Sequence, residues 1–276
     1  MKRRQFLKIG ALSTGAGALL SSYPFFIERY IVQVNTYKIP VPDLPKVFDN
    51  FRILHLTDLH LGPLVQDYFI DDVIQKSNAL PKEMIVCTGD YVNKRDSSGY
   101  IDQVWPLIAK LKARYGVFNV LGNHDHWADF DRSLYWLNQT GQNIRHQAKA
   151  IEKDGQRIWI AGAGDLWEDK IGIDQALQNV PDNECRIVLA HNPDTADEAF
   201  QQRVDLMICG HTHGGQVKIP FIGAPILPVE NKKYSSGFIR SEKTNLFISR
   251  GIGWAIIPVR FNCYPEIAIL QLVQAT

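Results

Sequence analysis

A pattern that occurs five times limits how this chain can fold. In each case a short apolar run ends, and a carboxylate, amide or imidazole side chain follows at once. Between residues 52 and 209 these apolar runs alternate with segments of helical spacing. Strands that alternate with helices predict an α/β layered domain, and open α/β sheets place ligand sites at the carboxyl ends of their strands. We therefore expect the five polar clusters to meet at one edge of the sheets.

The periodicity predicts most of the elements. Apolar runs predict strands over 30–39, 52–57, 84–88, 117–121, 157–161, 186–190 and 206–209. Helical spacing predicts helices over 66–80, 101–115 and 131–139 and around 195–202. After Gly210 the helices stop, and strands punctuated by Gly and Pro continue to 247–249 and 267–273. Pro40, Pro42 and Pro45 cannot continue a sheet interior, so we expect a loop after residue 39.

The first two clusters are weak signals when each is considered alone. Asp58 and His60 follow the first strand of the alternation, where side-chain alternation would point both the same way. Asp90 follows Gly89 at the end of the next strand. A solvated strand end is the simpler interpretation of the first cluster alone, and an ordinary Gly-Asp turn explains the second.

Two of the other three clusters are more specific. Asn123, His124 and Asp125 follow Gly122, and a turn that needs Gly-Asn has no need of His-Asp directly afterwards. His191 enters a loop that contains proline, and alone it is more simply a structural histidine. His211 and His213 are separated by one residue and flanked by glycines that allow close backbone approach, which is a strong ligand signature.

The five clusters together predict a metal site. The set contains carboxylates, imidazoles and one amide, but no cysteine. Such a mixed oxygen and nitrogen shell suits divalent ions such as Mn, Fe, Zn or Mg and does not suit a closed structural zinc site. Metal identity stays open at this point.

The order of these motifs resembles the calcineurin-like metallophosphoesterase superfamily. Asp-x-His, Gly-Asp, Gly-Asn-His-Asp, His and Gly-His-x-His occur in that order over about residues 50 to 215. The amino-acid sequences of residues 57–62 and 210–216, together with the start of the chain, are similar to those of the exported bacterial phosphodiesterases of the YaeI/YkuE type. The resemblance implies a four-layer αββα sandwich, in which two mixed β-sheets are flanked by helices.

The resemblance also implies two divalent metal ions per chain. One ion would be held by Asp58, His60 and His213, the other by Asn123, His191 and His211, with Asp90 bridging both. The implied reaction is in-line attack of a metal-bridging hydroxide on a phosphate ester, most simply a phosphodiester. His124 would assist the leaving group as general acid or electrostatic stabiliser, and Asp125 would hold the His124 ring in one tautomer.

Several residues outside the motifs have two interpretations each. The aromatic run from Trp127 to Trp136 can form a wall of the substrate cleft or pack into the core. The loop over 217–238 is rich in apolar residues, which suits an amphiphilic phosphate ester or simple packing beneath a long loop. Arg250 and Arg260 can hold a substrate phosphate or form ordinary ion pairs.

The start of the chain predicts export. Arg3 and Arg4 precede an uncharged run from Ile9 to Ile27, which resembles a twin-arginine signal. We expect residues 1–28 to be a twin-arginine-type signal or an N-terminal anchor, 29–48 an N-terminal strand with a Pro-rich lead-in, and 49–276 the metallophosphoesterase domain. The expected partners are the Tat export machinery and a membrane surface, and the expected location is the periplasm or cell envelope. Oligomeric state is not predicted.

Composition narrows the function further. The chain has 30 basic and 29 acidic side chains, so no basic field favours nucleic acid. Four cysteines are too few for a disulfide framework in 276 residues. Two alternatives to a phosphodiesterase remain. One is a membrane-associated pyrophosphatase for a lipid-linked or nucleotide-sugar substrate resembling UDP-diacylglucosamine. The other is a non-catalytic envelope scaffold stabilised by metal. His124 and Asp125 disfavour the scaffold, because a scaffold does not need a proton donor.

Overall fold

Two mixed β-sheets form the centre of the protein. The computed structural model describes residues 22–93, 98–241 and 243–275, so most of the predicted export signal lies outside the described residues. The first sheet has the order β1 (Gln33–Val41), β11 (Glu266–Gln274), β2 (Arg52–Leu56), β3 (Met84–Cys87) and β4 (Val117–Asn119). The second has the order β5 (Ala148–Lys153), β6 (Gln156–Gly162), β7 (Cys185–Leu189), β8 (Leu206–Cys209), β10 (Asn245–Ile248) and β9 (Gly237–Arg240).

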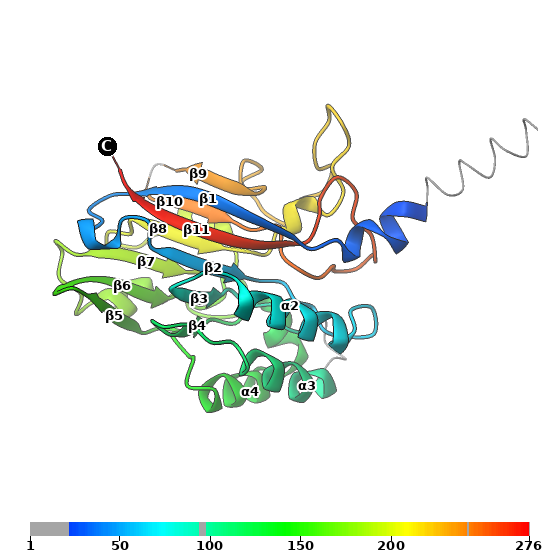
Figure 1. Cartoon of the computed structure of the whole chain (residues 1–276), viewed down its shortest axis with the longest axis horizontal. Helices are drawn as coiled ribbons and strands as arrows, with labels where there is room; N and C mark the ends of the chain where they lie inside the picture. The colour runs from blue at the N-terminus through cyan, green and yellow to red at the C-terminus, as the bar shows by residue number, and fades with distance from the viewer. Residues whose placement is uncertain (1–21, 94–97, 242, 276) are drawn as a thin grey trace, which may run out of the picture.

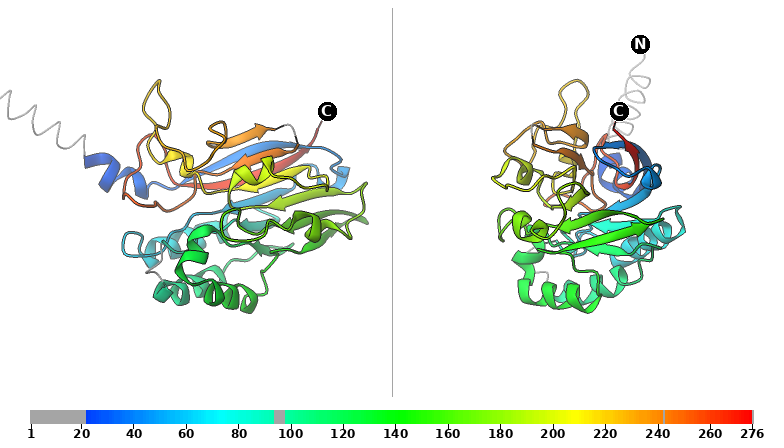
Figure 2. Two further views of the ribbon diagram at one scale, coloured as in Figure 1. Left: turned by 180° about the vertical axis from the view of Figure 1, so that it is seen from behind. Right: turned by 90° about the vertical axis from the view of Figure 1, so that its left-hand side faces the viewer.

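Helices cover the outer faces of both sheets. The first sheet carries α2 (Asp67–Ala79), α3 (Ser98–Ile108) and α4 (Asn123–Gln139), which lie together on one side of the molecule (Figures 1 and 2). The second sheet packs against α5 (Ile173–Leu177) and the 3₁₀ turn η4 (Pro193–Asp197). Three shorter 3₁₀ turns complete the elements: η1 (Glu28–Tyr30), η2 (Lys46–Phe48) and η5 (His213–Gly215). The predicted four-layer αββα sandwich is confirmed.

Strand β3 illustrates why the layers form. All four of its residues are buried, as expected for a strand that is covered on both faces. Met84 and Val86 belong to the core between the sheets, whereas Ile85 and Cys87 belong to the core beneath the helices. Because side chains alternate along a strand, one short apolar run supplies two hydrophobic layers.

The prolines after residue 39 do not end the first strand, which corrects one prediction. Strand β1 continues through Pro40 to Val41 and pairs in parallel with β11. It forms the edge of its sheet, where a residue without an N–H group removes no ladder hydrogen bond. One other prediction also changes, because the helix expected around 195–202 is only the turn η4. The helix predicted over 131–139 is present as the second part of α4, which begins at Asn123 and is kinked at Asp129.

Candidate metal centre

The site lies where the carboxyl ends of both sheets meet, as predicted. Strands β2, β3 and β4 of the first sheet end just before Asp58, Asp90 and Asn123. Strands β7 and β8 of the second sheet end just before His191 and His211. Within each sheet the strands concerned run parallel, so their carboxyl ends share one edge. Five loops from two sheets therefore supply one cluster of buried polar side chains.

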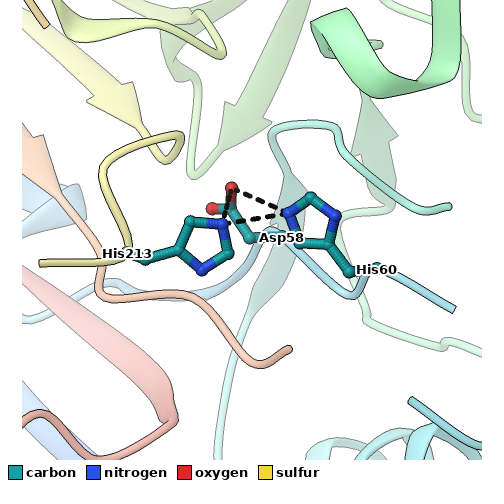
Figure 3. A group of neighbouring side chains, drawn as sticks. All are labelled: Asp58, His60 and His213. Carbon is teal, nitrogen blue, oxygen red and sulfur yellow. Dashed lines mark hydrogen bonds and ion pairs between the residues drawn. The ribbon is translucent and has the colours of Figure 1, made fainter. Parts of the chain in front are cut away.

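The first group of metal-ligand side chains consists of Asp58, His60 and His213. Figure 3 shows the two rings and the carboxylate turned towards a common point. The Nε2 atoms of His60 and His213 are 3.0 Å apart, and Asp58 Oδ1 lies 3.3 Å from Nε2 of His213. Two neutral ring nitrogens with lone pairs facing each other are unfavourable unless a proton or a cation lies between them. The geometry therefore fits a metal ion.

The second group consists of Asp90, His191 and His211. Asp90 Oδ2 lies 3.2 Å from Nε2 of His191, and that nitrogen lies 3.1 Å from Nδ1 of His211. Asn123 stands directly before His124, whose backbone N–H donates to Asp90 Oδ1 at 2.9 Å, and its own side-chain oxygen is buried with no hydrogen-bond partner among the described residues. A buried carbonyl oxygen without a donor is costly, and a cation would satisfy it.

Asp90 joins the two groups. Its Oδ2 atom is 3.5 Å from Nε2 of His60 in the first group and 3.2 Å from Nε2 of His191 in the second. The carboxylate is almost fully buried, so it interacts with the charges of this site rather than with bulk water. The structure thus brings six of the seven predicted ligands together and places Asp90 between the two sets.

Five of the seven predicted ligands adopt the left-handed backbone conformation. The φ angles of Asp58, His60, Asp90, His211 and His213 lie between 51° and 68°. For residues other than glycine this conformation costs about 1–2 kcal/mol each and is concentrated at functional sites. It also corrects the sequence argument for the first cluster, because β2 ends at Leu56 and strand alternation does not orient the side chains beyond it.

The comparison with known proteins agrees with this geometry. A sequence model of the calcineurin-like phosphoesterases matches residues 51–215, which is more than half of the chain. The chain belongs to the calcineurin-like phosphoesterase family. Together with the buried His and Asp groups, this membership makes it a metal-dependent phosphoesterase. The resemblance that the motifs indicated is confirmed.

Two bacterial members of the family align along almost the whole chain. The uncharacterized metallophosphoesterase YkuE of Bacillus subtilis is 32% identical over 284 residues, covering 99% of this chain and 98% of YkuE. The phosphodiesterase YaeI of Escherichia coli is 33% identical over 289 residues, covering 99% of this chain and all of YaeI. The narrower similarity to this type of phosphoesterase is also confirmed.

Charge at the phosphoesterase site favours metal binding. Burial alone would raise the pKa of Asp58 and Asp90, but neighbouring histidines hold the pKa of both carboxyls below the usual value. Burial lowers the pKa of His211 to about 4 and also lowers that of His213. The carboxylates are therefore ionised and these two imidazoles neutral near pH 7, which is the state that binds metal.

Backbone carbonyls orient two of the histidines. The Nδ1–H group of His191 donates to the Thr88 carbonyl at 2.7 Å, which leaves Nε2 free to face Asp90. The Nε2–H group of His211 donates to the Pro228 carbonyl at 2.9 Å, which leaves Nδ1 free to face His191. Such outer contacts fix the tautomer and direction of a metal-binding imidazole.

The structure corrects the contact expected for Asp125. Its carboxylate accepts the backbone N–H groups of Gly122 and Asp90 at 2.9 Å and of Tyr91 at 2.8 Å, instead of holding the His124 ring. The ring Nδ1–H group donates to the Asn93 carbonyl. Asp125 therefore positions the loop that carries Asp90 rather than the imidazole of His124.

His124 itself lies beside the metal groups, as predicted. Its ring packs edge-on against that of His60, with centroids 4.7 Å apart, and its backbone N–H donates to Asp90 Oδ1 at 2.9 Å. Burial lowers the pKa of His124 to about 4, although Asp90 opposes this shift. The ring is therefore neutral near pH 7 when no substrate is bound.

The two arginines do not face the site as free phosphate ligands. Arg250 pairs with the buried Glu266 at 2.6 Å. Arg260 is fully buried and donates to the backbone carbonyls of Gly253 at 3.1 Å and Cys263 at 3.1 Å. The ion-pair interpretation therefore holds for Arg250. Arg260 forms no ion pair among the described residues, and its guanidinium lies 3.4 Å from Nδ1 of His213.

Two residues near the centre were not predicted. Asp165 is buried, and burial raises its pKa to about 6, while its carboxylate accepts the N–H of Trp167 at 3.0 Å. The Trp167 ring lies edge-on to His211 at 4.6 Å and stacks with Trp127, which in turn contacts His124 at 4.8 Å. Gly164-Asp165 follows β6 just as Gly89-Asp90 follows β3, and this repeat of the pattern was the available signal.

Proposed function

We propose that this phosphoesterase hydrolyses phosphodiesters at a dinuclear metal centre. The observation that carries the proposal is the position of Asp90, whose single Oδ2 atom faces a histidine of each ligand group. One ion would be held by Asp58, His60 and His213, and the other by Asn123, His191 and His211. Preference for diesters is supported by the similarity to YaeI, which is described as a phosphodiesterase.

The protein's own residues prepare the substrate for displacement. When bound, two divalent ions would neutralise the phosphoryl oxygens and lower the pKa of the attacking water. His124 stands beside this position with its Nδ1–H fixed on the Asn93 carbonyl, so Nε2 is the atom available to the leaving group. The negative charge of a bound phosphate favours protonation of His124, which then gives that proton to the departing alkoxide.

The role of His124 is tested by comparing leaving groups. Bis(4-nitrophenyl) phosphate releases a phenolate that needs no proton, whereas a dialkyl phosphate releases an alkoxide that does. We expect His124→Ala to slow the dialkyl ester about 10²–10⁴-fold and the nitrophenyl ester far less. Metal content should stay at two ions per chain, which separates loss of the acid from loss of the site. Equal slowing of both esters would contradict proton donation by His124.

An amphiphilic pyrophosphate is a second candidate substrate. A cavity of about 310 Å³ opens beside His124 and is lined by Pro63, Leu64, Asn93 and Ile256. Three of these four lining residues are apolar, which suits an ester that carries a hydrocarbon group. Parallel assays of a soluble diester and a lipid-linked pyrophosphate separate the candidates, since the preferred substrate should show the larger kcat/KM.

Export is proposed from the sequence of residues 1–28. The support is the pair Arg3 and Arg4 before the uncharged run from Ile9 to Ile27. Replacing both arginines by lysine should retain the protein in the cytoplasm, and cells without the Tat machinery should retain the unchanged chain as well. Normal periplasmic or envelope location in such cells would contradict the proposal. The ions in use, among Mn, Zn, Fe and Mg, are to be assigned by metal analysis of the purified protein.

A further inference from the structure

Large apolar side chains are exposed on three segments of the chain, and one of them, Ile256, also lines the cavity beside His124. We call this set the apolar rim, and it comprises Phe25, Phe26, Phe221, Ile222, Ile226 and Ile256. Phe221 is fully exposed, and Ile256 is 89% exposed. The other four are between 40% and 76% exposed. Monomeric soluble proteins rarely leave such side chains contiguous, and where they do the surface usually binds something apolar.

Three segments that are distant in sequence carry the rim. Residues 22–30, the loop after η5 and the loop before β11 all extend from the end of the molecule that holds the metal centre (Figures 1 and 2). Hydrogen bonds tie them together: Arg260 N–H donates to the Pro24 carbonyl at 3.1 Å, and Lys218 N–H donates to the Phe261 carbonyl at 2.8 Å. The Gln216 side chain bonds both ways with the backbone of Ala255, at 3.1 Å and 2.7 Å. The three segments that carry the rim are therefore joined to one another.

Two rim residues adopt a strained backbone conformation. Phe221 and Ile256 have φ angles of 68° and 61°, in the left-handed region. That conformation is unusual for an aromatic residue and still more so for a β-branched one. In both loops a strained backbone therefore presents an apolar side chain to solvent, and such strain is concentrated where a protein binds ligands or partners.

The charge of these segments matches a lipid surface better than a second protein copy. Across 22–31, 61–66, 216–229 and 252–264 the only acidic residue is Glu28. Its side chain is buried and accepts the Cys263 N–H at 2.9 Å. The nearby cations are bonded within the protein, since Lys218 Nζ donates to Ser236 Oγ at 2.9 Å and Arg29 donates to the Pro258 carbonyl at 3.4 Å. The segments are therefore apolar and present no acidic group that would repel an anionic bilayer.

The sequence that leads into the rim supports the same partner. The run from Ile9 to Ile27 carries no charge, and near its end Phe25 and Phe26 belong to the rim itself. No helix among the described residues is long and apolar enough to span a bilayer. Aromatic and aliphatic side chains on separate loop tips fit the headgroup boundary of a bilayer.

We propose that the apolar rim inserts into an anionic lipid bilayer and docks the protein with its metal centre facing the membrane. The docking stands independently of the proposed reaction. One consequence does rest on the proposed function: the cavity beside His124 shares Ile256 with the rim, so it would open towards the bilayer. A substrate with a hydrocarbon group could then reach the site without leaving the lipid.

Local fluorescence on the full-length chain tests the docking. The four native cysteines are all buried, so an environment-sensitive thiol dye reacts selectively with a cysteine introduced at Phe221→Cys or Ile256→Cys. With vesicles of phosphatidylethanolamine and phosphatidylglycerol, we expect emission at both positions to shift to shorter wavelength and to increase several-fold. Tyr135→Cys is the matched control, since Tyr135 is 58% exposed on α4, away from the rim.

Each outcome decides the proposal. Unchanged emission at both rim positions would overturn the docking proposal. This includes the case in which residues 1–21 alone attach the chain to vesicles. An equal change at position 135 would overturn it too, as would a concentration-dependent shift without vesicles, which would indicate a second copy of the chain. A further variant combines the label at position 256 with Phe221→Asp and Ile222→Asp. The lipid concentration that gives half of the maximal emission shift should rise about tenfold or more in this variant. Its midpoint of thermal unfolding should stay unchanged. An unchanged lipid requirement would count against rim insertion.

Discussion

His191 holds a proton that an arriving metal ion must displace. Burial alone would lower the pKa of this imidazole, but its contact with the Asp90 carboxylate raises the pKa to about 10. His191 and Asp90 therefore form a buried ion pair near pH 7, and an ion held by the second group would take the place of the imidazolium charge.

This ion pair predicts that metal affinity depends on pH. Because the protonated form of His191 cannot bind metal, affinity should rise about tenfold per pH unit from pH 6 to 9. Calorimetric titration in two buffers of different ionisation enthalpy should show release of about one proton for this residue. Affinity that is independent of pH, with no proton release, would show that His191 is already neutral.

At the scale of residues the sequence predicts which side chains meet but not how they are held. Asp58, His60 and His213 are identifiable because their motifs occur in order at strand ends. The sequence does not predict their left-handed backbone conformation. It also does not predict the backbone N–H groups that donate to the Asp125 carboxylate. Asp165 was missed because Gly-Asp after a strand is an ordinary turn unless the structure places it near His191.

The junction of β1 and β11 depends on one buried carboxylate. Glu266 accepts hydrogen bonds from Asn35 at 2.8 Å and Tyr37 at 2.7 Å, and it pairs with Arg250 at 2.6 Å. Burial raises the pKa of Glu266, but Arg250 and these hydrogen bonds outweigh burial, and the net pKa is lower than usual. The pair therefore stabilises the fold above the ordinary carboxyl pKa and loses that effect as pH falls below it.

Glu266→Gln should lower the free energy of unfolding at pH 7. The expected loss is about 2–3 kcal/mol, because Arg250 keeps its charge without a carboxylate partner. Urea unfolding at pH 7 and pH 4 measures it, and the difference between the two proteins should shrink at pH 4. Glu184→Gln, which removes a more exposed pair with Arg157, is the control and should cost less than about 1 kcal/mol. A difference that grows on acidification would contradict the account.

Among the elements, segments with a clear apolar pattern are predictable and polar ones are not. Helix α2 and strand β3 match the predicted ranges to within one residue at each end. The strand β5 was missed, although Asp154-Gly155 between β5 and β6 is a typical hairpin turn with φ of 48° and 75°. Helix α4 begins early because its first turn is formed by the metal-site residues Asn123 to Asp125, which carry no apolar periodicity.

At the scale of the molecule, the metal centre joins the two sheets. Asp58, His60, Asp90 and Asn123 follow strands of one sheet, while His191, His211 and His213 follow strands of the other. The alternation of strands and helices was sufficient to predict the layers. Packing of residues 22–30 against the loop before β11 was not predictable, since it depends on contacts such as Glu28 with Cys263.

Removing the metal should weaken the whole fold. Ions that bind only the folded state stabilise it by about 3 kcal/mol at a hundredfold excess over Kd, and ligands from both sheets are involved. We expect chelation to lower the unfolding midpoint by about 5–10 °C and re-addition of Mn²⁺ or Zn²⁺ to restore it. Thermal unfolding followed by circular dichroism checks this. An unchanged midpoint after verified metal removal would show that the site does not hold the sheets together.

The central claim is that two ions joined by Asp90 carry out phosphodiester hydrolysis. The direct measurement is hydrolysis of bis(4-nitrophenyl) phosphate by the chelated protein as Mn²⁺ is added in known equivalents. We expect no activity without metal, a plateau at two equivalents per chain, and no recovery in Asp90→Asn, whereas Asp71→Asn on α2 should recover fully. Full activity at one equivalent, or activity that survives chelation, would contradict it.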